Sequence, residues 1–329
     1  MNNSINVLIL SGGTRNKIVH YFKKELGPIG MVVVTDCSEL APALYDADRH
    51  FIVPRIDEEG YIEEILRICK TCSIKMVLSL IDPELRLLAK HRKDFLEIGT
   101  VPIISDYQVI EMCLDKYRMF QFLHSHGFNV VRHYVNKELF YKDEAEGFVS
   151  YPVIVKPIEG SASLNIHKAL SKEEVDLLFK HYDNLMIQEY IQGIEYGVDV
   201  YIDMLSKEPV AIFSKEKIRM RAGETDKSRS VKDEELFELI KHFVWKAKLK
   251  GVIDFDILKS YGKYFIMDVN PRFGGGYLHA YECGVNFFQL MLNNICGKAN
   301  ESLIGNYDED IFMMKYNEVK IIKKAQLTP

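Results

Sequence analysis

The sequence predicts a chain of two parts, an α/β unit with a parallel sheet followed by an α+β unit with antiparallel strands. Apolar strands alternate with amphipathic helical stretches over the first hundred residues. Strands that are apolar throughout are typical of a parallel sheet covered by helices on both faces. After residue 105 the strands are shorter, and the link KSYG is short enough to join two of them as an antiparallel hairpin.

Composition limits the classes of function. The 329 residues are 47% hydrophobic and 27% charged, which is typical of a globular chain with two or three structural units. The formal net charge of -5 gives no general attraction to nucleic acid or to membranes, and no apolar run has the length of a membrane span. The opening MNNSINVLIL enters a strand directly rather than a signal peptide. A cytoplasmic enzyme is therefore expected.

In the first part we expect strands at 5–10, 31–35, 76–81 and 101–104, with helices near 15–26, 57–72 and 84–96. The first turn, SGGTRN, places Gly12 and Gly13 side by side, and Asp36 follows at a distance suited to a ribose. The G-x-G-x-x-G pattern of a dinucleotide site is absent. This part is therefore predicted to be a Rossmann-like domain whose strand ends bind a ligand other than NAD.

The cysteines and histidines suggest no metal or redox centre. Six scattered cysteines indicate free thiols in a reducing compartment. The single C-x-x-C, Cys69 and Cys72, ends a helical pattern, so two partly buried helix residues are the preferred interpretation. His124 and His126 are two apart on a predicted helix and do not converge on one ion.

The second part begins with one long predicted helix over 105–128, opened by Ser105 or Asp106 and ended by Gly127. A further helix is expected near 232–250. The expected strands are 151–157, 185–190, 195–204, 209–217, 251–258 and 263–269. The strand at 209–217 overlaps a longer stretch, 212–231, that is also expected to be a strand.

The last two strands carry acids within an otherwise apolar pattern. Asp254 and Asp256 share one face of the first strand, and Asp268 and Asn270 share one face of the second. Antiparallel pairing brings these faces together, so the carboxylates repel one another unless a positive group lies between them. Hard oxygen ligands suit a magnesium ion that bridges phosphates. A solvated polar face is the alternative for either strand alone.

Two other stretches suggest phosphate and nucleotide binding. Lys156 ends an apolar strand and precedes a loop of small residues, whose backbone N–H groups can approach phosphate oxygens. Further on, Glu189 ends a strand and Glu195 follows a glycine turn, where backbone groups can face an adenine edge and a carboxylate can face ribose hydroxyls. In isolation, both glutamates are typical surface residues. The loop comprises Gly160, Ser161, Ala162 and Ser163.

Taken in order, five stretches resemble the ATP-grasp superfamily, and its carbamoyl-phosphate-synthase-like branch in particular. The resemblance covers nearly the whole chain and implies a Rossmann-like pre-ATP-grasp domain over 1–110, a small lid subdomain over 111–190 and a C-terminal subdomain with the metal site over 191–329. The five stretches are LDKYRMFQFL, YPVIVKPIEGSAS, MIQEYIQGIEYGVDV, GVIDFDIL and MDVNPRFGGG.

The resemblance also implies roles for individual residues. Lys116 and Lys156 would contact ATP phosphates under the 160–163 loop, Glu189, Tyr190 and Ile191 would hold adenine, and Glu195 would hold ribose. Asp256, Asp268 and Asn270 would bind Mg²⁺, with Mn²⁺ as an alternative. Arg272 and Lys217 would act on the transferred phosphate. Gly12, Gly13, Asp82 and Glu84 would help to bind the acid substrate.

Two departures from the family pattern affect these roles. Aspartate stands at 256 where relatives have glutamine or glutamate, and at 268 where they have glutamate, so each carboxylate reaches one methylene less far. Lysines stand at 215 and 217 where relatives often have arginine. The metal spacing and the roles of these lysines are therefore open.

The activity that the resemblance implies is ATP-dependent ligation of a small carboxylate to an amine, or to a thiol, through an acyl phosphate. A homodimer is a family-level expectation, and no nucleic acid or membrane partner is expected. Two alternatives stay open: a small-molecule kinase with the same ATP site, and a regulatory nucleotide-binding protein without chemistry. An NAD dehydrogenase ranks lower.

Overall fold

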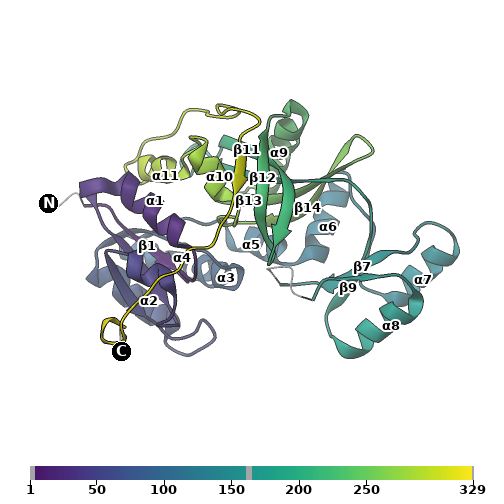
Figure 1. The fold of residues 1–329 in the computed structure, drawn as a ribbon, viewed down its shortest axis with the longest axis horizontal. Helices are drawn as coiled ribbons and strands as arrows, with labels where there is room; N and C mark the ends of the chain where they lie inside the picture. The colour runs from purple at the N-terminus through teal and green to yellow at the C-terminus, as the bar shows by residue number, and fades with distance from the viewer. Residues whose placement is uncertain (1–3, 161–164, 328–329) are drawn as a thin grey trace.

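Three sheets make up the protein, and the chain passes through them in sequence. The structure, a computed structural model, describes residues 4–160 and 165–327. Figure 1 shows the N-terminal unit, a six-stranded sheet in the middle and a small four-stranded sheet at the opposite end. Ser161, Ala162 and Ser163 of the predicted phosphate loop lie outside the described residues.

The N-terminal unit is the predicted parallel sheet, in the order β3-β2-β1-β4-β5. Alternate side chains of β1 enter different cores, Val7 and Ile9 on one face and Leu8 and Leu10 on the other, because both faces are covered by helices. The strands are β1 (Asn6–Leu10), β2 (Val32–Asp36), β3 (Arg49–Ile52), β4 (Ile74–Ser79) and β5 (Val101–Pro102). The helices are α1 (Asn16–Leu26), α2 (Tyr61–Thr71), α3 (Asp82–Lys90) and α4 (Arg92–Glu97), with 3-10 turns η1 (Gly27–Ile29) and η2 (Pro42–Asp46).

The long helix predicted over 105–128 is two helices, α5 (Tyr107–Leu114) and α6 (Lys116–Ser125). The break comes at Asp115, whose backbone is extended and whose Oδ1 accepts hydrogen bonds from the N–H groups of Tyr117 and Arg118. The Lys116 N–H donates to the Ile158 carbonyl instead of to a helical carbonyl. Apolar periodicity continues across this cap, so the pattern alone does not reveal it.

The small unit is a four-stranded antiparallel sheet in the order β6-β9-β7-β8, with α7 and α8 packed on it. Its core is separate from the cores of the other units among the described residues. The elements are β6 (His133–Tyr134), α7 (Lys137–Ala145), β7 (Val153–Pro157), β8 (His167–Ala169), α8 (Lys172–His181) and β9 (Leu185–Glu189).

The middle sheet has the order β14-β13-β10-β11-β12-β15 and contains the predicted hairpin, β13 paired with β14. The stretch 212–231, expected as one strand, is instead a second hairpin that turns at Ala222 and Gly223, both with positive φ. The strands are β10 (Ile194–Ile202), β11 (Pro209–Arg221), β12 (Glu224–Val231), β13 (Gly251–Ser260), β14 (Lys263–Asn270) and β15 (Phe312–Met314). The helices are α9 (Glu234–Ala247), α10 (Tyr277–Glu282) and α11 (Phe287–Ile295).

The chain returns to the N-terminal unit at its end. After β15, residues 315–327, which we call the C-terminal strap and which include η3 (Lys324–Gln326), run from the middle sheet across the N-terminal unit (Figure 1). Lys315 forms an ion pair with Glu224, and Lys320 forms one with Asp46. The strap therefore bridges the first and last parts of the fold.

The three sheets span residues 6–102, 133–189 and 194–314. We therefore propose units at 1–110, 111–190 and 191–329. In the part of the chain that the structure describes, no helix has the length and apolarity of a membrane span.

Replacing Asp115 with alanine is expected to lower the free energy of unfolding by about 1 kcal/mol, because two backbone N–H groups lose their acceptor. Asp115→Asn keeps an acceptor at the cap and serves as the matched variant. Urea unfolding followed by circular dichroism measures the difference. Equal stability of Asp115→Ala and wild type would show that the cap does not fix this helix break.

Candidate active site

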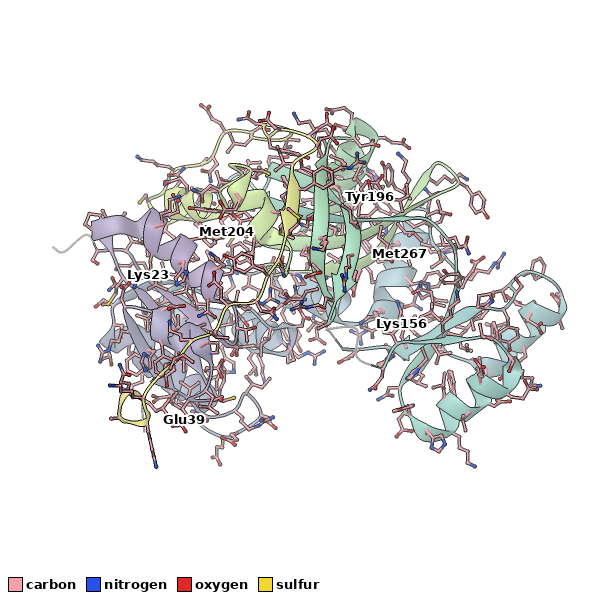
Figure 2. All side chains as sticks on the ribbon, in the orientation of Figure 1. Lys23, Glu39, Lys156, Tyr196, Met204 and Met267 are labelled. Carbon is pink, nitrogen blue, oxygen red and sulfur yellow. The ribbon has the colours of Figure 1, made fainter. Side chains whose placement is uncertain are left out.

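A cavity of about 680 Å³ lies where the three units meet. Its walls come from β7 and β9 of the small sheet, from β11 to β14 of the middle sheet, and from the loops after β1 and β4. Lys156 and Met267, labelled in Figure 2, line it from two different sheets. Among the predicted site residues, those that line it are Asp82, Lys116, Lys156, Gly160, Glu189, Tyr190, Ile191, Glu195, Lys217, Asp256, Asp268, Asn270 and Arg272.

The acids of the β13–β14 hairpin face one another as its register dictates. Asp256 pairs with Asp268, and Asp254 pairs with Asn270, directly across the two strands. Burial, together with the like charges of Asp256 and Asp199, raises the pKa of Asp254 to about 7. Burial also raises the pKa of Asp268. The strand pairing of the hairpin thus keeps these carboxyl groups close together although their negative charges repel one another.

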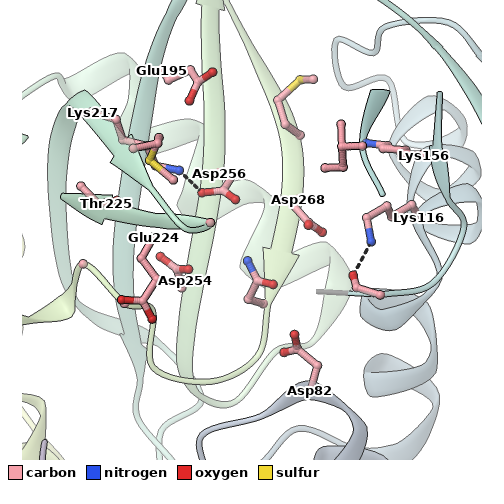
Figure 3. A pocket seen from close by; sticks show the side chains of 18 of the residues that line it. Asp82, Lys116, Lys156, Glu195, Lys217, Glu224, Thr225, Asp254, Asp256 and Asp268 are labelled. Atoms are coloured by element: carbon pink, nitrogen blue, oxygen red, sulfur yellow. Dashed lines mark hydrogen bonds and ion pairs between the residues drawn. The ribbon is translucent and has the colours of Figure 1, made fainter. Parts of the chain in front are cut away.

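Two cations on the middle sheet offset this charge. Lys217, which projects from β11, forms an ion pair with Asp256 (Figure 3). Arg272 donates from Nε to Asp82 Oδ1 at 2.9 Å, from Nη2 to Asp82 Oδ2 at 3.3 Å, and from Nη2 to Asn270 Oδ1 at 3.2 Å. The Asp82 carboxylate belongs to the N-terminal unit, so this fork fixes that unit against the end of β14.

Lysines from the opposite wall face the hairpin. Lys116 and Lys156 lie across the cavity from Asp268 in Figure 3. Lys116 donates from Nζ to the Gly160 carbonyl at 2.8 Å. Lys156 is only 7% exposed, and its Nζ makes no hydrogen bond or ion pair within residues 4–160 and 165–327. Burial lowers the pKa of Lys156 to about 8, so this ammonium lacks the compensation that a buried cation normally has.

The three glycines after β14 have no room for a side chain, because charged side chains pack directly against their backbone. A Cβ on Gly275 would lie 2.6 Å from the Glu224 carboxyl carbon, and one on Gly276 would lie 2.6 Å from Lys215 Cε. A Cβ on Gly274 would overlap the Asp254 carboxylate. The backbone therefore passes directly over charged side chains of the cavity wall.

The predicted adenine and ribose residues line the end of the cavity next to the small sheet. Glu189 accepts a hydrogen bond at Oε2 from the Arg132 N–H at 3.1 Å, which fixes its side chain beside β6. The Tyr190 ring carries the Lys168 ammonium 3.8 Å from its centroid. Glu195 lies at the start of β10, on the same wall as Lys217.

Three of the four residues expected to help bind the acid lie outside the cavity lining. Glu84 is fully buried and accepts hydrogen bonds from Ser11, Tyr61 and Ser79, and burial raises its pKa. Gly12 and Gly13 form the turn before α1, where the Gly13 N–H donates to Asp36 and a Cβ on Gly12 would meet Val34. None of the three lines the cavity, whereas Asp82 does.

Sequence analysis missed Arg15 and Glu224. Arg15 directly precedes α1 and reaches the cavity, where its Nη2 lies 2.8 Å from Glu224 Oε1. Its position three residues after Gly12 in SGGTRN is the available signal, since the loops at strand ends of such sheets bind ligands. Glu224 was missed because the β11–β12 hairpin, which places it in the cavity, was expected to be a single strand.

The oxygen donors in the cavity could supply only some of the ligands of a metal ion, and a bound ligand would have to supply the others. Within residues 4–160 and 165–327, no group of three or more His, Cys, Asp or Glu side chains is arranged to hold a metal ion. The predicted set has only two carboxylates, Asp256 and Asp268, together with the Asn270 amide. These oxygen donors fit Mg²⁺ when other ligands, such as phosphate oxygens and water, complete its octahedron.

Family models match most of the chain in two blocks. Residues 7–104 match the model of a PylC-like N-terminal domain, and residues 113–276 match that of an ATP-grasp domain. The carbamoyl-phosphate synthase of Methanobrevibacter smithii is 24% identical over 295 residues, covering 85% of this chain and 78% of that protein. The D-alanine–D-alanine ligase of Fervidobacterium nodosum is 29% identical over 164 residues, 45% of this chain and 52% of the ligase.

Solved structures share the fold at low sequence identity. The biotin carboxylase domain of Hydrogenobacter thermophilus 2-oxoglutarate carboxylase, solved as a dimer with MgADP and bicarbonate, has a TM-score of 0.73 at 16% identity, covering 93% of this chain and 73% of that chain. An L-amino acid ligase from Bacillus licheniformis has a TM-score of 0.67 at 17% identity, with 89% and 74% covered. These likenesses confirm the predicted fold class.

The buried Lys156 ammonium leads to a pH-dependent prediction. Its pKa falls from 10.5 in the unfolded chain to about 8 in the folded one, so burial of the charge opposes folding fully below pH 8. Lys156→Met keeps the apolar stem and is expected to raise the free energy of unfolding at pH 7 by about 2 kcal/mol. This gain should shrink as the pH rises from about 8 toward 10.5, where the folded wild type has already released the proton.

Denaturant unfolding at several pH values measures the effect. The exposed Lys180→Met is the matched control and should show no such pH dependence. A Lys156→Met variant less stable than wild type at pH 7 would show that the ammonium has a stabilising partner.

Proposed function

Because the chain belongs to the ATP-grasp superfamily of ligases, we propose that it joins a small carboxylate to an amine at the expense of ATP, through an acyl phosphate. The observation that carries the proposal is the separation of charge across the cavity. Lys116 and the unpartnered Lys156 face the carboxylates of the β13–β14 hairpin. Such an arrangement suits a polyphosphate whose divalent cation is turned toward the acids.

In this proposal, Lys116 and Lys156 bind the phosphates of ATP below the loop that contains Gly160, Ser161, Ala162 and Ser163. Glu189, Tyr190 and Ile191 hold adenine, and Glu195 holds the ribose. A phosphate next to Lys156 would supply the negative charge that its buried ammonium lacks. Two solved structures of the same fold were obtained as complexes with MgADP and with ADP, which supports a nucleotide as the ligand.

Asp256, Asp268 and Asn270 would hold Mg²⁺, or Mn²⁺ in its place. When bound, the metal supplies Lewis-acid stabilisation of the charge on the transferred phosphoryl group. Lys217 already forms an ion pair with Asp256 and lines the same wall, so it holds a positive charge beside this group. Arg272, positioned by its fork to Asp82, lies at the end of β14 where the acyl phosphate would form.

The overall reaction balances as R–COO⁻ + R′–NH₃⁺ + ATP⁴⁻ → R–CO–NH–R′ + ADP³⁻ + HPO₄²⁻ + H⁺. A carboxylate oxygen first attacks the γ-phosphorus, and the bond from that phosphorus to the ADP oxygen breaks. The amine nitrogen, after losing a proton, then attacks the acyl carbon, and phosphate leaves with the carboxylate oxygen still attached. The partners are small molecules, and a homodimer is our proposal for the assembly, supported by the dimeric biotin carboxylase domain.

Asp268→Ala and Asn270→Ala are each expected to lower turnover at least about 100-fold, because each removes an oxygen ligand from the proposed metal. ADP release measures turnover, and circular dichroism checks the fold. Asp183→Ala, an exposed carboxylate outside the cavity, is the control. Wild-type activity in either cavity variant would show that the replaced residue is not a ligand of the metal.

Isotope transfer separates ligation from simple phosphorylation. Glycine, the other nineteen standard amino acids in their L form, D-alanine and bicarbonate are screened with MgATP and hydroxylamine. A selected acid is then supplied with ¹⁸O in its carboxylate. We expect a hydroxamate and one ¹⁸O atom in each released phosphate, because the nucleophile expels phosphate with the substrate's oxygen. Unlabelled phosphate would indicate direct hydrolysis of ATP. A stable phosphorylated acid without phosphate release would indicate a kinase.

A further inference from the structure

We propose that Arg15 binds the carboxylate of the acid substrate and that Lys315 of the C-terminal strap positions it through Glu224. This inference rests on the proposed function and deepens it. It assigns the carboxylate subsite to a residue of the N-terminal unit and gives the last segment of the chain a part in substrate binding.

Arg15 has hydrogen-bonding capacity that the protein leaves unused. Its guanidinium has five N–H donors, and within residues 4–160 and 165–327 it has one acidic partner, Glu224, at 2.8 Å. The side chain is 24% exposed, and that exposure faces the cavity. A mostly buried guanidinium with free donors is well suited to a planar carboxylate, which accepts two parallel hydrogen bonds.

Burial lowers the pKa of the Arg15 guanidinium, and the nearby positive charge of Arg272 lowers it further. Arg15 is already paired with Glu224 at 2.8 Å, and Arg272 is already paired with Asp82 at 2.9 Å and with Asp254 at 3.8 Å. An anion between the two would interact favourably with both. This places the acid's carboxylate beside Arg272, where the proposed phosphoryl transfer requires it.

Glu224 is shared between two cations. One oxygen faces Arg15, and the other accepts from the Lys315 ammonium at 2.8 Å. Its carboxyl group also packs directly over the Gly275 backbone, which leaves no room for a side chain there. The Lys315 ammonium therefore weakens the attraction between Glu224 and Arg15. Without Lys315, the Glu224 carboxylate would compete more strongly with the substrate carboxylate for the Arg15 guanidinium.

The strap holds Lys315 in place by contacts on both sides of it. Before it, β15 pairs with β12, and after it Asn317 accepts a hydrogen bond from Arg221 at the tip of the cavity hairpin. Lys320 then reaches Asp46 of the N-terminal unit. Residues 15, 224 and 315, which are far apart in sequence, thus meet at the Glu224 carboxylate.

Acetate is the probe, titrated into the full chain with MgADP present and followed by isothermal calorimetry. We expect Arg15→Ala to weaken acetate binding at least tenfold, Arg15→Lys to weaken it less, and Lys315→Ala to weaken it about threefold. Affinity for MgADP should stay unchanged in all variants. The exposed Lys298→Ala, which removes a surface cation elsewhere, should match wild type.

The double variant decides whether Lys315 acts through Arg15. If it does, Arg15→Ala with Lys315→Ala binds acetate no more weakly than Arg15→Ala alone. An additive loss would mean that Lys315 attracts the anion directly and would overturn the positioning role. Acetate binding to Arg15→Ala as tight as to wild type, or no acetate binding to wild type, would overturn the subsite itself. Loss of MgADP binding by the wild type would instead refute the proposed function.

Discussion

The repulsion among the carboxylates of the β13–β14 hairpin is the constraint to which the rest of the cavity responds. Asp256 pairs directly with Asp268, and Asp254 lies two residues before Asp256 on the same strand. Burial limits the screening of Asp254 and Asp268 by water. Lys217 and Arg272 compensate part of this charge from within the middle sheet and at its end. The negative charge that these two cations leave uncompensated faces the cavity, where a cation bound with a ligand would balance it.

Each structural unit contributes charged side chains to this centre. The middle sheet supplies the acids, the small sheet supplies Lys156, and the N-terminal unit supplies Asp82 and Arg15. The middle sheet also carries Lys217, and Arg272 follows β14, so the charge that a ligand meets depends on which of these groups already have partners. Lys217 is paired with Asp256 of its own sheet, whereas the Lys156 ammonium has no hydrogen bond or ion pair within residues 4–160 and 165–327.

The sequence predicted the parts of the site that depend on local periodicity. Asp256 and Asp268 were expected to meet because strand alternation and antiparallel pairing leave little choice, and they are register partners. The parallel sheet followed equally from its continuously apolar strands. Arg15 and Glu224 could not be foreseen in this way, because their contact joins α1 to a hairpin two hundred residues later. Glu84 lies only two residues from Asp82, but its side chain is buried against Tyr61 instead of lining the cavity, and proximity in sequence does not reveal this difference in direction.

The C-terminal strap has a consequence for the order in which the protein is made. A ribosome releases the N-terminal unit first, and that unit has its own parallel sheet and one core cluster formed largely from its own residues. The contacts of Lys315 and Lys320, however, join residues that follow all three sheets in the chain to Glu224 and Asp46. These long-range contacts can form only after the strands of all three sheets have been made. A nascent chain halted before residue 315 would therefore contain every one of these strands while Glu224 still lacked its Lys315 partner.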